Sequence, residues 1–244
     1  MLRLVYFPLR ARAEPLRMLL RHANIAFTDE LVPFAAWPEL KPHVPGSQLP
    51  QLKFEDSTLL PQTKDIALHV ATLAGPPLLP ADADAASAAL HCWQEIHSTS
   101  VPHIRHVWAE ATPWDARIGA CNPLLNWLPE EEAVPLIPAF LKGAAEWLGR
   151  LEPRCRGGGA FFGGAAPHHG EFATFHIVNN ICTLDGGALL AVQSQRVQDW
   201  YASMQALPAV AAYLDERPQP GTGQVGRPES LIFRHARPWE RVSV

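Results

Sequence analysis

The chain has 244 residues, of which 48% are hydrophobic, and a formal net charge of -4 at pH 7. This length allows one large domain or two modest ones around a sizeable core, and the charge balance supplies no basic surface for a nucleic acid. No apolar stretch reaches the 18 residues that a membrane-spanning helix requires, so we expect no membrane insertion.

The first 75 residues alternate between strand and helix patterns. Pro15 suits the first turn of a helix, where its missing N–H costs nothing. The predicted elements are a strand at 2–7, a helix that follows 10–14 and ends near 24, a strand at 27–32, a hairpin at 52–60 and a helix at 63–74.

The long connection before the hairpin is rich in proline. Its prolines exclude a long helix or a central strand, and they stand at positions 33, 38, 42, 45 and 50. An irregular but ordered loop of this length is typical of functional sites.

The rest of the chain reads as helical. Residues 76–84 combine proline with alanine and aspartate and predict a linker. Helices are then predicted at 86–111, 131–151, 171–183, 189–207 and 209–217, with Pro102 kinking or dividing the first of them. Residues 218–244 are rich in Pro, Gly and Arg and form a C-terminal extension.

Together these motifs resemble the glutathione transferase family, and most of all its sigma class, which includes glutathione-dependent prostaglandin D synthases. The motifs are Tyr6-Phe7, Arg10-Ala11-Arg12-Ala13-Glu14, Trp37-Pro38-Glu39-Leu40-Lys41-Pro42, Gln48-Leu49-Pro50, Leu60-Pro61-Gln62-Thr63 and the helix 207–218. The match covers residues 1–75 well and 85–217 in outline. It implies an α/β thioredoxin-like, glutathione-binding domain at 1–75, a linker at 76–84, an all-α helical domain at 85–217 and the extension 218–244.

The resemblance makes Tyr6 the catalytic residue. A thiol with a pKa near 8.5 is only about 7% thiolate at pH 7.4, and the thiolate is the nucleophile. A phenolic O–H aimed at the sulfur can lower that pKa through a charge-assisted hydrogen bond. Arg12 would add a guanidinium near the phenol and stabilise the negative charge. A packing tyrosine and a solvated arginine are the structural alternatives.

Three further segments are expected to bind glutathione. Trp37 and Lys41 stand four residues apart, so one helical turn would point the indole N–H and the ammonium at the glycine carboxylate. The resemblance implies a cis Leu49–Pro50 peptide, with Leu49 and Pro50 offering backbone atoms to the cysteinyl group and Gln48 close by.

Gln62 and Thr63 open the helix at 63–74, where free N–H groups and the helix dipole attract the γ-glutamyl carboxylate. Asp65 could contact the amino group.

Further along, the family has Ser or Thr three residues before Asp at the start of its core helix. This chain has His168-His169-Gly170-Glu171, which lacks the hydroxyl cap.

The second substrate is expected to lie against the first long helix. Candidates for the walls of its pocket are Leu9, Arg10, His103, Ile104 and Trp108, and His97 and His106 are near them. Core packing is the alternative for the apolar members. The extension could fold over this pocket or pack on the surface.

The leading hypothesis is a sigma-like glutathione transferase of the detoxification type, whose Tyr6-activated thiolate attacks a small hydrophobic electrophile. The resemblance implies glutathione as co-substrate and a homodimer, and we expect no metal. The four cysteines show no metal-ligand spacing, and the amino terminus lacks signal-peptide zones, so we expect a cytoplasmic protein. Alternatives are a peroxidase, an isomerase or lyase of a biosynthetic pathway, and a non-catalytic binding protein.

Overall fold

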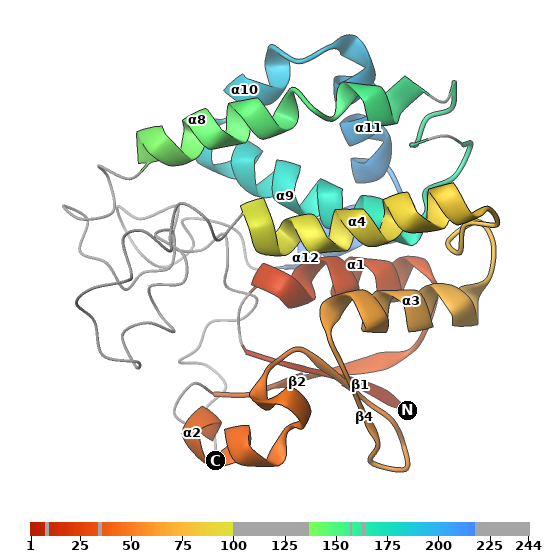
Figure 1. Ribbon diagram of the computed structural model, residues 1–244, viewed down its shortest axis with the longest axis vertical. Coiled ribbons are helices and arrows are strands. Elements are labelled where there is room, and N and C mark those ends of the chain that lie inside the picture. Colours follow the sequence, from red (N-terminus) through yellow and green to blue (C-terminus); the bar gives the residue numbers. More distant parts are fainter. Residues whose placement is uncertain (8–9, 34–35, 100–136, 157, 163, 218–244) are drawn as a thin grey trace.

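A mixed four-stranded sheet forms the lower part of the molecule in Figure 1. The structure is a computed structural model, and it describes residues 1–7, 10–33, 36–99, 137–156, 158–162 and 164–217. The strands are β1 (Leu2–Tyr6), β2 (Phe27–Leu31), β3 (Gln51–Lys53) and β4 (Leu59–Pro61), in the spatial order β2-β1-β3-β4. β1 runs parallel to β2 and antiparallel to β3, and β3 runs antiparallel to β4. This is the sheet of a thioredoxin-like domain.

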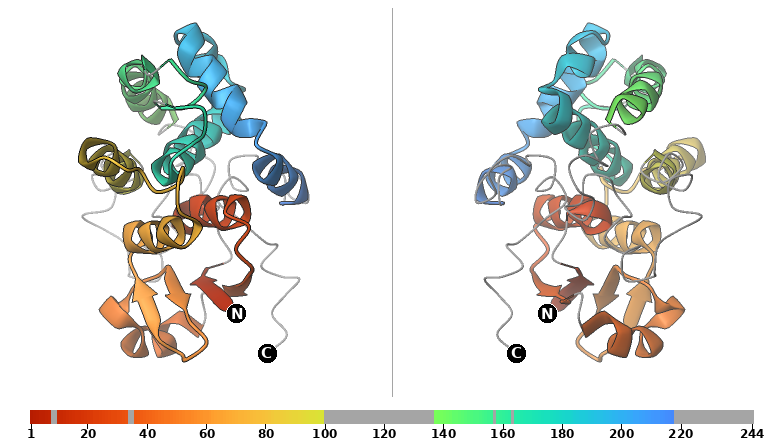
Figure 2. Two further views of the ribbon diagram at one scale, coloured as in Figure 1. Left: turned by 90° about the vertical axis from the view of Figure 1, so that its right-hand side faces the viewer. Right: turned by 90° about the vertical axis from the view of Figure 1, so that its left-hand side faces the viewer.

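Helices α1 (Glu14–His22) and α3 (Thr63–Ala74) lie side by side on one face of the sheet (Figure 1 and Figure 2). Leu16, Leu19 and Leu20 recur at helical spacing on α1, and all three are fully buried in one core with Leu4 of β1 and Leu52 of β3. Pro15 stands in the first turn of α1, as predicted. The predicted order of strands and helices in this half is confirmed.

The proline-rich connection contains three short helical turns: α2 (Trp37–Leu40), η3 (Lys41–His43) and η4 (Pro45–Ser47). Each has a proline in its first two positions, where the ring fixes a helical φ at no cost in hydrogen bonds. In the described part of this connection the expected exclusion of a long helix therefore holds.

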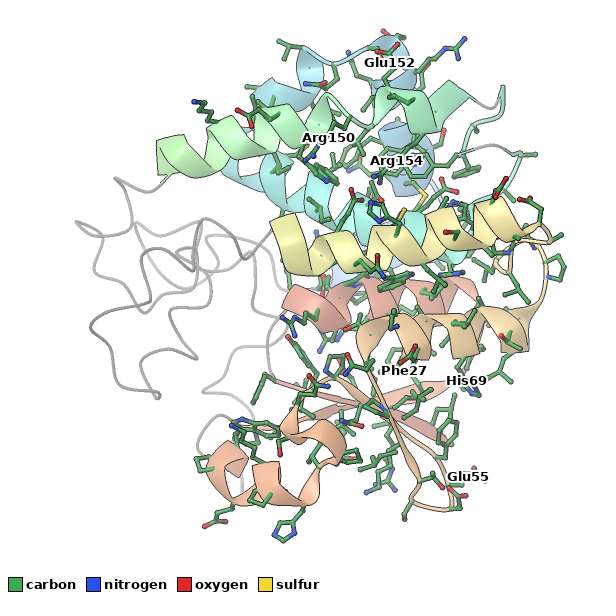
Figure 3. The ribbon with its side chains drawn as sticks, in the orientation of Figure 1. Phe27, Glu55, His69, Arg150, Glu152 and Arg154 are labelled. Atoms are coloured by element: carbon green, nitrogen blue, oxygen red, sulfur yellow. The ribbon has the colours of Figure 1, made fainter. Side chains whose placement is uncertain are left out.

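The second half is helical and lies above α1 and α3 in Figure 1. Its helices are α4 (Ala83–Thr99), α8 (Ile137–Leu148), η6 (Glu152–Arg156), α9 (His169–Asp185), α10 (Ala188–Ala191), α11 (Gln195–Gln205) and α12 (Pro208–Glu216). α9 is central and contacts α4, α1 and α11. Arg154 of η6, labelled in Figure 3, donates to both carboxylate oxygens of Glu95 on α4 at 2.6 Å.

The packing of α9 against α4 depends on the absence of a side chain at Gly170. A Cβ at this position would lie 2.4 Å from the carbonyl oxygen of Ala89, far inside van der Waals contact. Any larger residue would therefore push α9 away from α4.

Two expectations about the helical half need correction. The helix predicted at 189–207 is divided into α10 and α11 at Ser194, whose backbone is extended, with φ -59° and ψ 151°. Beside the break, the Gln193 side chain donates to the Leu189 carbonyl and the Gln198 side chain donates to the Gln193 carbonyl, each at 2.9 Å. These bonds satisfy the backbone at the break. The first long helix begins at Ala83, inside the predicted linker, and its Pro102 lies outside the described residues.

The start of α9 carries a capping box despite the missing hydroxyl. His168 Nδ1 accepts a hydrogen bond from the Gly170 N–H at 3.1 Å, and Glu171 Oε1 accepts one from the His168 N–H at 3.0 Å. An imidazole therefore does the work of the expected Ser or Thr.

α3 ends at Ala74 and α4 begins at Ala83, so the connection between them, 75–82, overlaps the predicted linker 76–84. The domain limits 1–75 and 85–217 stay a prediction. No helix among the described residues is long and apolar enough to cross a membrane.

Candidate functional site

A row of aromatic rings begins at the end of β1. Tyr6 is the last residue of that strand and is only 5% exposed, and its carbonyl accepts a hydrogen bond from the Val32 N–H at 2.8 Å. The Tyr6 and Phe7 rings have centroids 5.6 Å apart, and the Phe7 and Trp37 rings meet edge to face at 5.4 Å. The predicted thiol-activating phenol and the predicted carboxylate-binding indole thus belong to one packed group.

Trp37 and Lys41 stand at the two ends of α2. Trp37 is 4% exposed, whereas Lys41 is half-buried and its N–H donates to the Trp37 carbonyl at the end of the turn. This single helical turn gives the pair the shared face that the spacing requires. Their contact with a carboxylate stays a prediction.

Gln48, Leu49 and Pro50 lie directly before β3, which is an inner strand of the sheet. The Leu49–Pro50 peptide is cis, as expected from the resemblance, and both residues are buried. The side chain of Gln51 donates to the Gln48 carbonyl at 2.8 Å and to the Pro45 carbonyl at 3.0 Å. These two bonds hold the loop in place, and no sequence pattern had indicated this role for Gln51.

The start of α3 has an unusual backbone. Gln62 has φ 72° and ψ 121°, a conformation that residues other than glycine rarely adopt, and Thr63 behind it is 2% exposed. The Asp65 and Ile66 N–H groups bond to the Gln62 carbonyl, each at 3.0 Å. The first N–H groups of α3 and its positive dipole end are available to an anion here.

The two arginines before α1 differ in environment. Arg12 lies in η1 (Ala11–Ala13) with a partly exposed side chain. Arg10 is fully buried, with its Nε 3.9 Å from Glu14 Oε1. Burial, helped by the nearby Arg217, lowers the pKa of Arg10 to about 10, so its guanidinium remains charged at neutral pH.

Arg10 thus points into a buried ionic cluster, and its place in the second-substrate pocket stays a prediction. The other proposed members of that pocket lie outside the described residues: Leu9, His103, Ile104 and Trp108. Within the described ranges, no three His, Cys, Asp or Glu side chains are grouped as a metal site would require.

Sequence reasoning missed Arg17. Its guanidinium carbon lies 5.9 Å from the centroid of the Tyr6 ring, over the ring face. Glu14 and Arg17 are both buried on the apolar face of α1, three residues apart. A charged pair on the buried face of an amphipathic helix is the signal that could have revealed it.

A cavity of about 520 Å³ lies on the side of α1 toward β2 and α12. Its walls include Arg17 and Arg21 of α1, Phe27 and Asp29 of β2, and Tyr213 of α12. Phe27 is labelled in Figure 3 at the start of β2. This cavity contains none of the residues predicted to bind glutathione.

A thioredoxin-like sheet with a cis-proline loop, joined to a bundle of helices around α9, defines the class of protein: the chain has the architecture of glutathione transferases. Solved structures agree on the fold. Rat hPGDS complexed with a quinoline superposes with a TM-score of 0.68 at 22% identity, over 89% of this chain and 98% of that one. The prostaglandin synthase D of Nilaparvata lugens superposes with a TM-score of 0.67 at 17% identity, over 90% and 100%.

Sequence comparison leads to the same family. The chain is 48% identical to a class-mu 28 kDa glutathione S-transferase of Schistosoma japonicum over 54 residues, which span 22% of this chain and 26% of that protein. It is 28% identical to the hematopoietic prostaglandin D synthase of Gallus gallus over 222 residues, 89% of this chain and 96% of that protein. The first of these alignments spans only about a quarter of the relative's length. No family model matches the chain. The resemblance to glutathione transferases, sigma class included, is confirmed.

Proposed function

We propose that this protein is a glutathione-dependent enzyme in which Tyr6 stabilises the glutathione thiolate for attack on a hydrophobic electrophile. The observation that carries the proposal is the packed row of Tyr6, Phe7 and Trp37, which links the phenol to the helical turn of Lys41. The relatives named glutathione S-transferase and prostaglandin D synthase support a chemistry that uses glutathione.

In the proposed complex the glycine carboxylate meets Trp37 and Lys41, and the cysteinyl backbone meets Leu49. The γ-glutamyl group lies at the α3 N-terminus, near Gln62 and Thr63. The Tyr6 hydroxyl donates to the sulfur and Arg12 adds positive charge nearby. With an aryl halide, a carbon–sulfur bond forms, the carbon–halogen bond breaks with its electron pair, and the thiol proton leaves to solvent.

Tyr6→Phe tests the proposal. Removing the phenolic donor should raise the pKa of the bound thiol by about 1 to 2 units and lower kcat/KM for conjugation at pH 7 by ~10- to 100-fold. Glutathione affinity should change little, because the backbone and carboxylate contacts remain. The measurements are titration of thiolate absorbance in the binary complex, calorimetry with glutathione and an aryl halide assay.

Lys41→Ala should separate binding from activation by weakening glutathione affinity while leaving the pKa of the bound thiol near its starting value. Lys53→Ala is the matched control, because Lys53 ends β3 at the hairpin. Absence of glutathione binding together with absence of turnover in the unchanged protein would refute the proposed function.

A second candidate is a glutathione-dependent isomerase. The observation that favours it is the near full-length similarity to a prostaglandin D synthase. In that case the carbon–sulfur bond forms and breaks again within one cycle, so glutathione is released unchanged. Conjugation consumes glutathione in proportion to product, whereas isomerisation leaves its concentration constant, and a thiol assay during turnover separates the two.

A non-catalytic binding protein is a further alternative, since 68 residues are 43% identical to a crystallin, S-crystallin SL18 of Nototodarus sloanii, over 28% of this chain and 22% of that one. Tight binding of apolar ligands without glutathione binding would favour it.

We further propose a cytoplasmic homodimer. Sedimentation tests the dimer.

A further inference from the structure

The face of the Tyr6 ring rests on a buried cation. The Arg17 guanidinium carbon is 5.9 Å from the ring centroid, and Arg17 is fully buried while Tyr6 is only 5% exposed. Water and salt screen such a pair weakly. A cation in this position stabilises negative charge on the phenol or on an atom hydrogen-bonded to it.

Two carboxylates fix the orientation of Arg17. Asp29 on β2 accepts hydrogen bonds from Nε at 2.7 Å and from Nη2 at 3.3 Å, and Glu14 accepts one from Nη1 at 3.5 Å. Burial disfavours the charge, but the nearby Asp29 above all, with Tyr213 and Glu14, raises the pKa of Arg17 above its ordinary value. The guanidinium is therefore charged throughout the working pH range. Its planar set of N–H donors bonds to both oxygens of Asp29, which holds the group in one position.

Glu14 is shared with the end of the helical half. Arg217 Nη1 donates to Glu14 Oε1 at 2.7 Å, Tyr213 Oη donates to Oε2 at 2.8 Å, and Arg10 Nε lies 3.9 Å from Oε1. Three guanidinium groups thus meet the two carboxylates of Glu14 and Asp29, so positive charge prevails in this part of the described structure.

The neighbouring titratable groups are neutral and do not cancel that charge. Burial and the adjacent Glu14 raise the pKa of Tyr213 well above its ordinary value. Burial lowers the pKa of His176 on α9 to about 3. Neither side chain changes its charge between pH 5 and 9.

We propose that Arg17 is a positioning residue for the thiolate chemistry: held by Asp29 and Glu14, its guanidinium orients the Tyr6 ring and lowers the pKa of the thiol that the phenol binds. This inference rests on the proposed function. It adds a second positive group, fully buried, to the partly exposed Arg12.

The test compares two full-length variants that break the same ion pair but change the charge in opposite directions. Arg17→Met removes the cation and should raise the pKa of bound glutathione by about one unit. Asp29→Asn removes a compensating anion and should lower it. Thiolate absorbance against pH in the binary complex gives both values.

A purely structural ion pair predicts a different pattern, because both variants would then disturb Tyr6 alike and shift the pKa in the same direction. Arg17→Lys keeps the charge without the fork and should recover part of the effect. Asp29 is 20% exposed and borders the cavity beside α1, so asparagine has room there and this variant remains informative if Arg17→Met fails to fold.

Tyr6→Phe in the same titration keeps the two hypotheses apart. If it leaves the thiol pKa unchanged, the proposed function fails. If it raises the pKa while Asp29→Asn gives no shift or an upward one, the role of Arg17 alone is overturned. In the double variant Arg17→Met, Tyr6→Phe, the arginine effect should shrink, since it acts through the phenol.

Discussion

Gln62 holds a backbone conformation that suits glycine, directly before a helix that begins with a buried threonine. Its φ of 72° with ψ of 121° costs on the order of 1–3 kcal/mol for a residue with a side chain. Strain of this size persists where the surroundings enforce it, and here the Asp65 and Ile66 N–H groups both bond to the Gln62 carbonyl. We propose that the Gln62 side chain contacts the γ-glutamyl group of glutathione.

Gln62→Gly should therefore separate stability from binding. Glycine adopts positive φ freely, so the melting temperature should stay the same or rise by a few degrees. Glutathione affinity should fall about 10-fold, because the variant removes the proposed side-chain contact with the γ-glutamyl group. Calorimetry and thermal unfolding measure the two effects, and a destabilised variant with unchanged affinity would contradict this account.

At this scale the sequence predicted residue types better than conformations. Gln62 and Thr63 were identified from their place at the start of a helical pattern, but the amino-acid sequence does not indicate that Gln62 has a positive φ. Arg17 was missed because an arginine three residues after Glu14 usually faces solvent. Its partner Asp29 is 12 positions away on another element, and that pairing depends on the register of β2.

At the scale of elements, the start of α9 is capped by His168 instead of the Ser or Thr that the family usually has there. Glu171 is 1% exposed, and besides the His168 N–H it accepts hydrogen bonds from the Phe162 N–H at 3.1 Å and from Trp200 Nε1 at 2.8 Å. The cap thus also ties the preceding loop and α11 to the core helix.

His168→Ala should lower the free energy of unfolding by about 1 kcal/mol, through loss of the bond to the Gly170 N–H. His168→Ser should recover most of it, because a serine oxygen caps the same turn. The corresponding shift in melting temperature is about 2–4 °C. A serine variant no better than alanine would show that His168 stabilises by packing on Phe162 instead.

The elements themselves were predictable where hydrophobic period and proline position agree. The range of α3 (Thr63–Ala74) matches the prediction. Pro208 stands in the first turn of α12, within the motif 207–218 that resembles the last core helix of the family. The division between α10 and α11 was not predictable, because the sequence does not indicate the extended backbone at Ser194, and the glutamines beside it are ordinary helix formers.

At the scale of the whole molecule, Glu14 joins the two halves. It lies on α1, which covers the sheet, and it accepts hydrogen bonds from Tyr213 of α12 and from Arg217 just after that helix. Arg217 in turn donates to Asn179 of α9 at 2.6 Å. Such a buried network specifies how α12 and α9 dock on α1, and breaking it by removing one partner leaves charges buried without compensation.

The same interior makes stability depend on pH through three buried histidines. Burial lowers the pKa of His168 to about 4, of His169 to about 4 and of His176 to about 3, against an ordinary value of 6.5. Below pH 6.5 these histidines bind protons in the unfolded chain, whereas in the folded chain they stay neutral until the pH approaches 4. Their contribution to stability is therefore present above pH 6.5 and is lost as the pH falls toward 4.

Glu171 acts in the opposite direction. Burial raises its pKa from 4.5 to about 7, so its favourable contribution is present below pH 4.5 and is lost as the pH rises through 7. Between pH 4.5 and 6.5 the three histidines outnumber this one carboxyl. The difference is at most two protons, so stability should fall on acidification by at most about 2.7 kcal/mol per pH unit.

Urea unfolding at several pH values between 4.5 and 7.5 measures this slope. His176→Leu should make the slope shallower by about one proton, since a neutral apolar side chain has nothing to titrate. His43→Ala, which changes an exposed side chain on η3, should leave it unchanged. Glu171→Gln should make the slope steeper despite its cost to the cap, because the opposing carboxyl is gone. A flat profile in the unchanged protein would mean that the interior around α9 admits protons without unfolding.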